Sequence, residues 1–335
     1  MSIQSETPEA DRWLADGWTV NPGLVSAEEI AAAMSEVLTL VPAPEEFHRD
    51  PEAARRAWRI PGGGADDGVL ADGPDFRPEQ FRWEQMFPFE DCPTLNRLCF
   101  HPGILDFVRE SLGTEDIRLY QAGLDVKYSG DTSYEQPLHI DSNHSFLPGS
   151  RVQRWRYLEG FLYLTDVRES TGATHFLPMS ESASALGKSA PRAWPSAELE
   201  PVRSFLVPGR VLSEADNAKL YGMTTPAVGD RGSFLAYGPQ VLHRAVEITE
   251  PRLWRVILNI SFRAAHQEWV GFHSWQPNST KRAWTQLVAD RTPEELAVIG
   301  FPPPGHPVWD DELIELTSER YPGLNMRPWR DALGR

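Results

Sequence analysis

Three short stretches of the sequence place a histidine two residues before a carboxylate, a combination that can bind a metal ion. On an extended strand, side chains two positions apart emerge on the same face, so both groups can reach one ion. With 9 histidines and 48 acidic residues among 335, chance predicts roughly one such pair, so the spacing alone carries little weight. The pairs are His48/Asp50, His139/Asp141 and His266/Glu268.

The first and last pairs lack the surroundings of a metal site. His48 and Asp50 lie in a turn-rich segment before PEAARRAW, away from any strand-like run, and we expect a solvated surface pair there. His266 and Glu268 follow the last clear strand, and the histidines after them lie among loops. Neither pair has a natural third ligand.

The middle pair has better surroundings. His139 and Asp141 lie in PLHIDSNHS, which is followed by strand-like runs and, much later, by His243 at the end of GSFLAYGPQVLH. Two neutral imidazoles and one carboxylate on one face of an octahedron form the ligand set of non-haem iron(II) oxygenases, and they leave positions open for a cosubstrate and oxygen. The sequence therefore predicts an iron(II) site made of His139, Asp141 and His243.

An arginine in the strand-like run after His243 points to a second binding group. Arg255 lies within WRVILNISF, where a buried cation is costly unless an anion pairs with it. A guanidinium binds a carboxylate through two parallel hydrogen bonds, so we expect a carboxylate-bearing ligand beside the metal. Arg252, three residues earlier and on the opposite face of a regular strand, is the alternative.

The composition limits the class of protein. Hydrophobic residues make up 41% and charged residues 24%, as in soluble globular proteins. The formal net charge of −16 disfavours binding to nucleic acid or to an anionic membrane surface, and no apolar run is long enough for a membrane span. Two cysteines and an acidic first segment, MSIQSETPEADRW, predict a cytoplasmic protein without a signal peptide. The late tryptophans suit a pocket wall, a contact in a homo-oligomer or ordinary core packing.

Short strand-like runs dominate the centre of the chain. IRLYQAGLDVKY, EGFLYLTDV, GSFLAYG and RVILNISFR are rich in β-branched and aromatic residues, with partial alternation of apolar and polar positions. They do not alternate regularly with helices, which argues against a doubly wound parallel sheet. We therefore predict a mainly β fold with flanking helices, built on an antiparallel sandwich or barrel.

The surrounding segments predict one domain over residues 1–335. Helical spacing over 9–40, with Ser26 as an N-cap, and over 92–113 predicts a mainly helical N-terminal layer. Between these two helices, 42–80 carries turn signals and is expected as a long surface segment. The expected layout is a helical layer over 1–113, a β core over 114–264 interrupted by an insertion over 181–229, and a C-terminal extension of helix and loop over 265–335.

The order of these motifs resembles the phytanoyl-CoA dioxygenase family of iron(II)- and 2-oxoglutarate-dependent oxygenases. The resemblance rests on His139-x-Asp141, then GFLYLTDVRESTGATHFLPMS, then His243 and an arginine about a dozen residues later. It extends to DGWTVNPGLVSAEEI near the start and GFPPPGHPVW near the end, and so covers most of the chain. One departure is that LPMSES lacks the histidine that often follows the serine in this turn.

The resemblance implies a double-stranded β-helix, the jelly roll of the cupins, with its site in the mouth between two sheets. It implies that His139, Asp141 and His243 bind Fe(II) and that Arg255 binds the distal carboxylate of 2-oxoglutarate. Further cosubstrate contacts are implied for Gln121, Lys127 and Ser142, with Arg252 as the competing arginine. The implied reaction consumes O2, releases succinate and CO2, and hydroxylates a small molecule; desaturation is left open.

Substrate contacts and the rival functions depend on fewer residues. The candidates that flank the metal motif are Tyr134, Asn143, His144 and Trp155. One alternative is a cupin-like metalloenzyme that works without 2-oxoglutarate, and another is a jelly-roll protein that binds a small ligand without turnover. A zinc hydrolase would also use two histidines and a carboxylate, but the sequence offers no recognisable general base for it.

Overall fold

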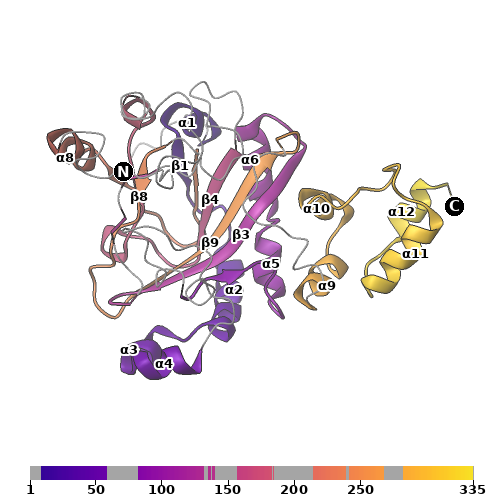
Figure 1. The fold of residues 1–335 in the computed structure, drawn as a ribbon, viewed down its shortest axis with the longest axis horizontal. Coiled ribbons are helices and arrows are strands. Elements are labelled where there is room, and N and C mark those ends of the chain that lie inside the picture. Colours follow the sequence, from indigo (N-terminus) through magenta and orange to yellow (C-terminus); the bar gives the residue numbers. More distant parts are fainter. Residues whose placement is uncertain are drawn as a thin grey trace, which may run out of the picture.

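Two antiparallel sheets lie at the centre of the computed structural model (Figure 1). The large sheet has the order β1-β7-β4-β9-β3-β2 and the small sheet the order β6-β5-β8. The large-sheet strands are β1 (Trp18–Asn21), β2 (Gln85–Met86), β3 (Ile117–Tyr128), β4 (Tyr157–Tyr163), β7 (Phe234–Tyr237) and β9 (Trp254–Ala264). The small-sheet strands are β5 (His175–Phe176), β6 (Thr225–Pro226) and β8 (His243–Arg244). The structure describes residues 9–58, 82–131, 135–136, 138–139, 157–182, 184, 214–238, 241–267 and 282–334.

The chain alternates between the sheets as it proceeds. It runs through β3 in the large sheet, a bridge at His139 beside β8, β4 in the large sheet, β5 and β6 in the small one, β7, β8 and finally β9. This alternation is the path of a double-stranded β-helix. The predicted mainly β jelly roll with flanking helices is therefore confirmed.

Strand β9 shows how the two faces of the large sheet differ. Val256, Leu258, Ile260 and Phe262 belong to the main hydrophobic core beneath the helices. The intervening Ile257 belongs to a second cluster, which contains Phe176 of the small sheet. Because side chains alternate along a strand, every residue on the face of Ile257 points between the sheets. The polar residues at these positions are Arg255, Asn259, Ser261 and Arg263.

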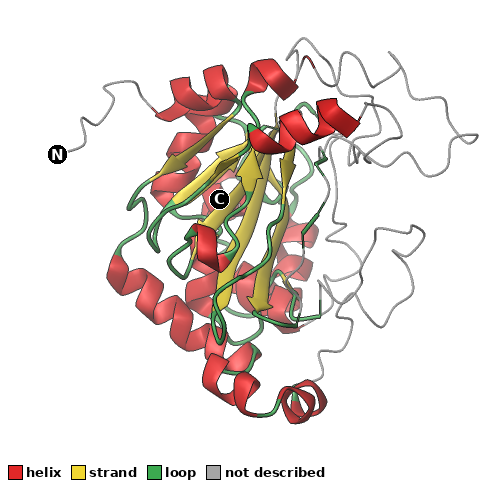
Figure 2. Cartoon of the chain, turned by 90° about the vertical axis from the view of Figure 1, so that its left-hand side faces the viewer, coloured by secondary structure: helices red, strands yellow, loops and turns green. Residues whose placement is uncertain are grey.

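Helices from the first part of the chain cover the outer face of the large sheet (Figures 1 and 2). Helix α6 (Pro102–Leu112) contacts β4 and β9, and α2 (Ala27–Leu40) contacts α5 (Pro93–Leu98). As predicted, Ser26 caps α2, through a reciprocal capping box with Glu29. The apolar faces of these helices close the core, as the sequence periodicity indicates.

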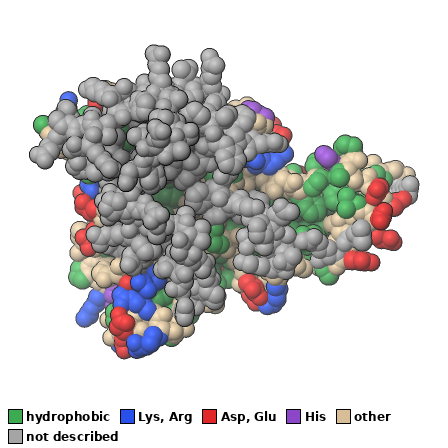
Figure 3. Space-filling view, in the orientation of Figure 1, with side chains coloured by type: hydrophobic (Ala, Val, Ile, Leu, Met, Phe, Trp, Pro, Cys, Tyr) green, Lys and Arg blue, Asp and Glu red, His purple; other side chains and the backbone are tan. Residues whose placement is uncertain are grey.

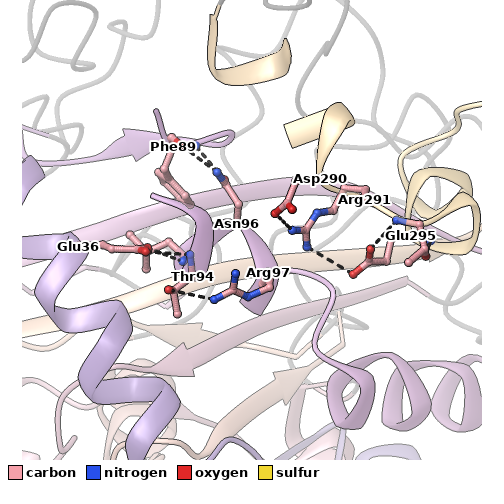
Figure 4. A network of polar contacts seen from close by, with 10 residues as sticks. Glu36, Phe89, Thr94, Asn96, Arg97, Asp290, Arg291 and Glu295 are labelled. Carbon is pink, nitrogen blue, oxygen red and sulfur yellow. Dashed lines mark hydrogen bonds and ion pairs between the residues drawn. The ribbon is translucent and has the colours of Figure 1, made fainter. Parts of the chain in front are cut away.

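Side-chain hydrogen bonds tie this layer together (Figure 4). Both Glu36 oxygens in α2 accept hydrogen bonds from backbone N–H groups of α5, at Thr94 (2.9 Å) and Leu95 (2.8 Å). The Asn96 side chain accepts from the Phe89 N–H at 2.9 Å and donates to the Phe89 carbonyl at 2.7 Å. Backbone groups at helix ends and in buried turns are thereby satisfied.

The N-terminal layer contains a strand that the helical pattern does not predict. The expected helix over 9–40 is divided into α1 (Glu9–Asp16), β1 and α2. Gly17 ends α1 with φ +81°, a conformation that glycine adopts without steric cost. Trp18 to Asn21 then pair with β7 and extend the edge of the large sheet. Pairing with a partner more than two hundred residues away overrides the local helical tendency.

Three other segments differ from the sequence-based layout. The segment over 42–80 contains α3 (Pro44–Arg49) and α4 (Pro51–Ala57), both started by proline. The stretch over 181–229 contains α8 (Glu214–Gly222) and β6, so part of the expected insertion belongs to the small sheet. The predicted helix over 92–113 is two helices, α5 and α6, because Pro102 begins a new one.

The C-terminal helices form one end of the molecule (Figure 1). They are α9 (Arg282–Ala289), α10 (Pro293–Val298), α11 (Asp311–Arg320) and α12 (Arg327–Ala332). Trp309 and Trp329 are buried there with ring centroids 5.9 Å apart, so these two late tryptophans are core residues. Hydrophobic side chains also gather on the surface of this end (Figure 3), where Val308 is exposed. None of the helices in the described part of the chain is long and apolar enough to cross a bilayer.

Candidate active site

Two of the three predicted metal ligands lie side by side on the small sheet. His139 and His243 exchange both backbone hydrogen bonds of an antiparallel bridge, at 2.9 and 3.0 Å. Their ring centroids are 4.3 Å apart, and both residues are more than nine-tenths buried. The structure thus brings together two imidazoles that are over a hundred residues apart in the sequence.

Neighbouring groups orient the His243 ring. Its Nδ1 lies 3.0 Å from the Val241 carbonyl, so this nitrogen carries the proton that is donated there. A ring held in this tautomer presents Nε2 as its ligand atom, the usual arrangement for a metal-bound histidine. Phe176 stacks on the ring at 5.4 Å, and Tyr237 lies 4.8 Å from it. The histidine is therefore both aligned and screened from water.

The predicted carboxylate ligand, Asp141, lies outside the described residues, as do Ser142, Asn143, His144, Tyr134 and Trp155. Among the residues that are described, no three His, Cys, Asp or Glu side chains gather as a metal site. The two histidines nevertheless fit iron: they lie on neighbouring extended segments, are buried, and one is oriented by a backbone carbonyl. Asp141 as their carboxylate partner stays a prediction.

A pair of buried cations lies on the inner face of the large sheet. Lys127 of β3 and Arg255 of β9 are direct cross-strand partners, with only 7% and 4% of their surfaces exposed. Like charges directly opposite each other destabilise a sheet. Burial lowers the pKa of both groups, and for Lys127 the charge of Arg255 lowers it further. Such a pair is stable only when negative charge lies close to it.

Asp125 supplies part of that negative charge, and one N–H donor of Arg255 is left without a partner among the described residues. The Asp125 carboxylate lies 4.0 Å from Lys127 Nζ and 3.9 Å from a terminal nitrogen of Arg255. The Arg255 guanidinium also donates to the Gly172 carbonyl. Its Nε is buried without a hydrogen-bond partner in the described structure. An anion that enters between the sheets would satisfy this donor and offset the excess positive charge.

The two candidate arginines lie in different environments. Arg252 is exposed, in a left-handed turn with φ +63° before β9 begins. Arg255 is buried and faces the interior. A charge–charge interaction is far stronger away from water, so Arg255 is the better placed of the two to bind a carboxylate.

Gln121, another candidate cosubstrate contact, lies well away from this pair. It is opposite Ser261, at the far end of β9 from Arg255. Six residues of strand correspond to about 20 Å, so Gln121 and Arg255 cannot bind the same carboxylate group. The Gln121 Oε1 atom is buried without a hydrogen-bond partner in the described part of the chain. Lys127 is therefore adjacent to Arg255, whereas Gln121 lies in the interior near the opposite end of β9.

Sequence inspection did not single out the polar group that surrounds Gln121. The register of β3 shifts between Leu119 and Gln121, and such a bulge re-aims side chains towards the interior. Tyr120 donates a hydrogen bond to Glu159 of β4, and Ser261 donates to the other Glu159 oxygen at 2.6 Å. The sequence does carry one signal for this cluster: a glutamate within the strand-like run YLEGFLY is rarely buried unless polar partners surround it.

The two rejected histidine pairs have structural or peripheral places. His48 Nε2 lies 3.2 Å from the Leu253 carbonyl, and Asp50 caps α4 by accepting a hydrogen bond from the Ala53 N–H at 3.0 Å. The expected solvated surface pair thus stabilises a helix start and a loop contact. His266 is exposed, and Glu268 lies outside the described residues.

The model of the phytanoyl-CoA dioxygenase (PhyH) family matches residues 13–255. This range covers most of the chain and includes His139, Asp141, His243 and Arg255. The chain belongs to the phytanoyl-CoA dioxygenase family. It is accordingly an iron- and 2-oxoglutarate-dependent oxygenase, as the resemblance of its motifs implies.

Solved structures with similar folds share little sequence with the chain. The epimerase SnoN, in complex with Fe3+, alpha ketoglutarate and nogalamycin RO, is 19% identical, with a TM-score of 0.49 over 77% of this chain and 82% of its own. The alpha-ketoglutarate-dependent carbocyclase SnoK is 17% identical, with a TM-score of 0.45 over 77% and 83%. The non-haem monooxygenase ThoJ is 16% identical, with a TM-score of 0.47 over 77% of each chain. No curated protein matches the chain.

Proposed function

We propose that this member of the family hydroxylates a small organic molecule, with release of succinate and CO2. His139, Asp141 and His243 would bind the iron, which together with 2-oxoglutarate and O2 supplies the oxidising chemistry. An aspartate at position 141 supports hydroxylation or desaturation, because halogenases related to this family have a small residue there. Hydroxylation is the simpler outcome of the two.

The observation that carries the cosubstrate assignment is the buried pair of Lys127 and Arg255. Both cations face the sheet that holds His139 and His243. Phe176, Tyr163 and Tyr237 belong to the buried cluster between the sheets, and Phe176 and Tyr237 contact the His243 ring, so this side of the interior is apolar. A dicarboxylate with one end at the histidines and the other at the cations accounts for both halves of the site. A cupin-like metalloenzyme without a dicarboxylate cosubstrate would not explain the buried cations Lys127 and Arg255.

The remaining contacts follow from position. Lys127 would assist Arg255 at the distal carboxylate, and Ser142 is proposed as a contact on the metal side. Tyr134, Asn143, His144 and Trp155 stay candidates for substrate contact, with Gln121 added because it lies on another level of the interior. The acidic charge and the two free, buried cysteines support a cytoplasmic enzyme that acts on a small molecule rather than on nucleic acid or a membrane.

An anaerobic titration tests this proposal. The purified protein is loaded with Fe(II), 2-oxoglutarate is added without oxygen, and the visible charge-transfer band of the chelate is followed. Succinate formation is then measured with oxygen against a panel of small molecules. The proposal expects a band and substrate-stimulated succinate. The absence of a band, or binding of small molecules without succinate release, would favour the cosubstrate-free metalloenzyme or the binding protein.

A further inference from the structure

The charge balance of the cation pair depends on two carboxylates at the edge of the large sheet. Asp125 lies two residues before Lys127 on the same face of β3. Its carboxylate is 3.9 to 4.0 Å from a nitrogen of each cation and retains 23% exposure of its side chain. The Asp125 carboxylate therefore interacts with both cations at once, at nearly equal distances.

The second carboxylate belongs to Glu84, immediately before β2. Gln85 pairs with Leu124, so the antiparallel register places Glu84 beside Asp125. A Cβ atom built on Gly123 would lie 3.6 Å from Glu84 Oε1, so this oxygen lies over the backbone of β3 next to Asp125. Burial and, to a smaller degree, the Asp125 charge together raise the pKa of Glu84 to about 7, against the opposing effect of Lys127.

Glu84 thus sets the charge of the whole group near neutral pH. With Glu84 protonated, two cations face one carboxylate and the group carries an excess positive charge. With Glu84 ionised, the group is neutral. From the packed strands, β9 adds Arg255, which interacts with Lys127 and Asp125, and β4 adds Tyr163, a buried phenol that interacts with Arg255. The guanidinium of Arg82, two residues before Glu84 in the chain, lies 4.0 Å from the Asp131 carboxylate.

We propose that Glu84 and Asp125 form an acidic pair that couples binding of the 2-oxoglutarate distal carboxylate to uptake of one proton. Asp125 is a positioning residue that holds Lys127 and Arg255 as a fork, and Glu84 takes the proton from solvent. This inference rests on the proposed cosubstrate site. The physical reason is linkage: an added negative charge beside Glu84 makes its ionised form less favourable.

The expected signature is a pH-dependent affinity. Both carboxyl groups of 2-oxoglutarate are ionised at neutral pH, so the ligand itself does not titrate there. Affinity is highest with Glu84 protonated and falls as the pH rises above about 7, by at most tenfold per pH unit for one proton. Glu84→Gln keeps the neutral form at every pH, so it removes this dependence and leaves binding intact.

Calorimetric titration of the Mn(II)-loaded full-length protein with 2-oxoglutarate measures the proton directly. At pH values above 7, titrations in phosphate and Tris give different apparent enthalpies if a proton is taken up, because the two buffers have different heats of ionisation. We expect this difference in wild type and its loss in Glu84→Gln, with Glu110→Gln on α6 as an exposed control that keeps it. Binding without proton uptake in wild type, or equal uptake in Glu84→Gln, overturns the inference alone. Failure of wild type to bind 2-oxoglutarate at any pH overturns the proposed cosubstrate site as well.

The positioning role of Asp125 is tested separately, by the direction in which Asp125→Asn changes the affinity for 2-oxoglutarate. If Asp125 only offset positive charge, Asp125→Asn would tighten the binding of an anion. A residue that holds the fork predicts the reverse: affinity about tenfold weaker, the order expected when a charged group loses its buried partner. Asp106→Asn, which removes an exposed carboxylate from α6, is the matched control and should leave affinity unchanged. Unchanged or tighter binding by Asp125→Asn would refute the positioning role.

Discussion

Replacing Arg255 with alanine is the most informative single change in the proposed cosubstrate site. It removes a guanidinium that is only 4% exposed and has a buried Nε without a partner in the described structure. Truncation of one member of a buried charge pair costs about 2 to 5 kcal/mol. Lys127 remains as a second cation, so we expect about 3 kcal/mol, which weakens 2-oxoglutarate binding by roughly a hundredfold.

Arg252→Ala is the matched control for this experiment. It removes the same charge from the same segment, but Arg252 is exposed in the turn before β9. Exposed charges are screened by water and salt, so we expect its affinity to stay within about twofold of wild type. Arg255→Lys keeps a cation but loses the two-pronged geometry, and it should fall between wild type and Arg255→Ala.

The assay is titration of the anaerobic Fe(II) protein with 2-oxoglutarate, followed through the charge-transfer band. Because Arg255 also donates to the Gly172 carbonyl, thermal unfolding of each variant is measured in parallel to confirm that it is folded. Full affinity in folded Arg255→Ala, together with weakened binding in Arg252→Ala, would refute the assignment and transfer the role to Arg252.

Three further predictions concern the metal, the core and the pH dependence of stability. Asp141→Ala should abolish iron-dependent succinate formation, and retained activity would exclude Asp141 as a ligand. Gly160→Ala should destabilise the protein by about 3 kcal/mol in urea unfolding, because its Cβ would lie 2.2 Å from a Phe234 ring carbon; Gly222→Ala, with nothing within 4 Å, is the neutral control. Burial raises the pKa of Glu84 in the folded state from 4.5 to about 7, so its stabilising effect is complete below 4.5 and is lost as the pH rises through 7. Wild type should therefore lose stability relative to Glu84→Gln over this range, and parallel pH profiles would contradict the prediction.

Local sequence determined the parts of this protein that depend on neighbours along the chain. Ser26 was predicted as an N-cap from the residues that follow it, and it does cap α2, because this contact is made within four residues. The strand-like runs predicted the jelly-roll strands, and the order of His139, Asp141, His243 and Arg255 predicted the family. These features have short-range or ordered patterns that a linear sequence displays.

The tertiary structure decided the parts that depend on register between distant segments. Strand β1 forms because its partner β7 is available, although the local pattern is helical. The pairing of β3 with β9 places Lys127 opposite Arg255 and moves Gln121 to the far end. A shift of one residue would turn each of these side chains to the other face of the sheet, and nothing in either strand alone specifies the partner. The sequence thus determined which residues could bind a metal and a carboxylate, and the fold decided which of them share a site.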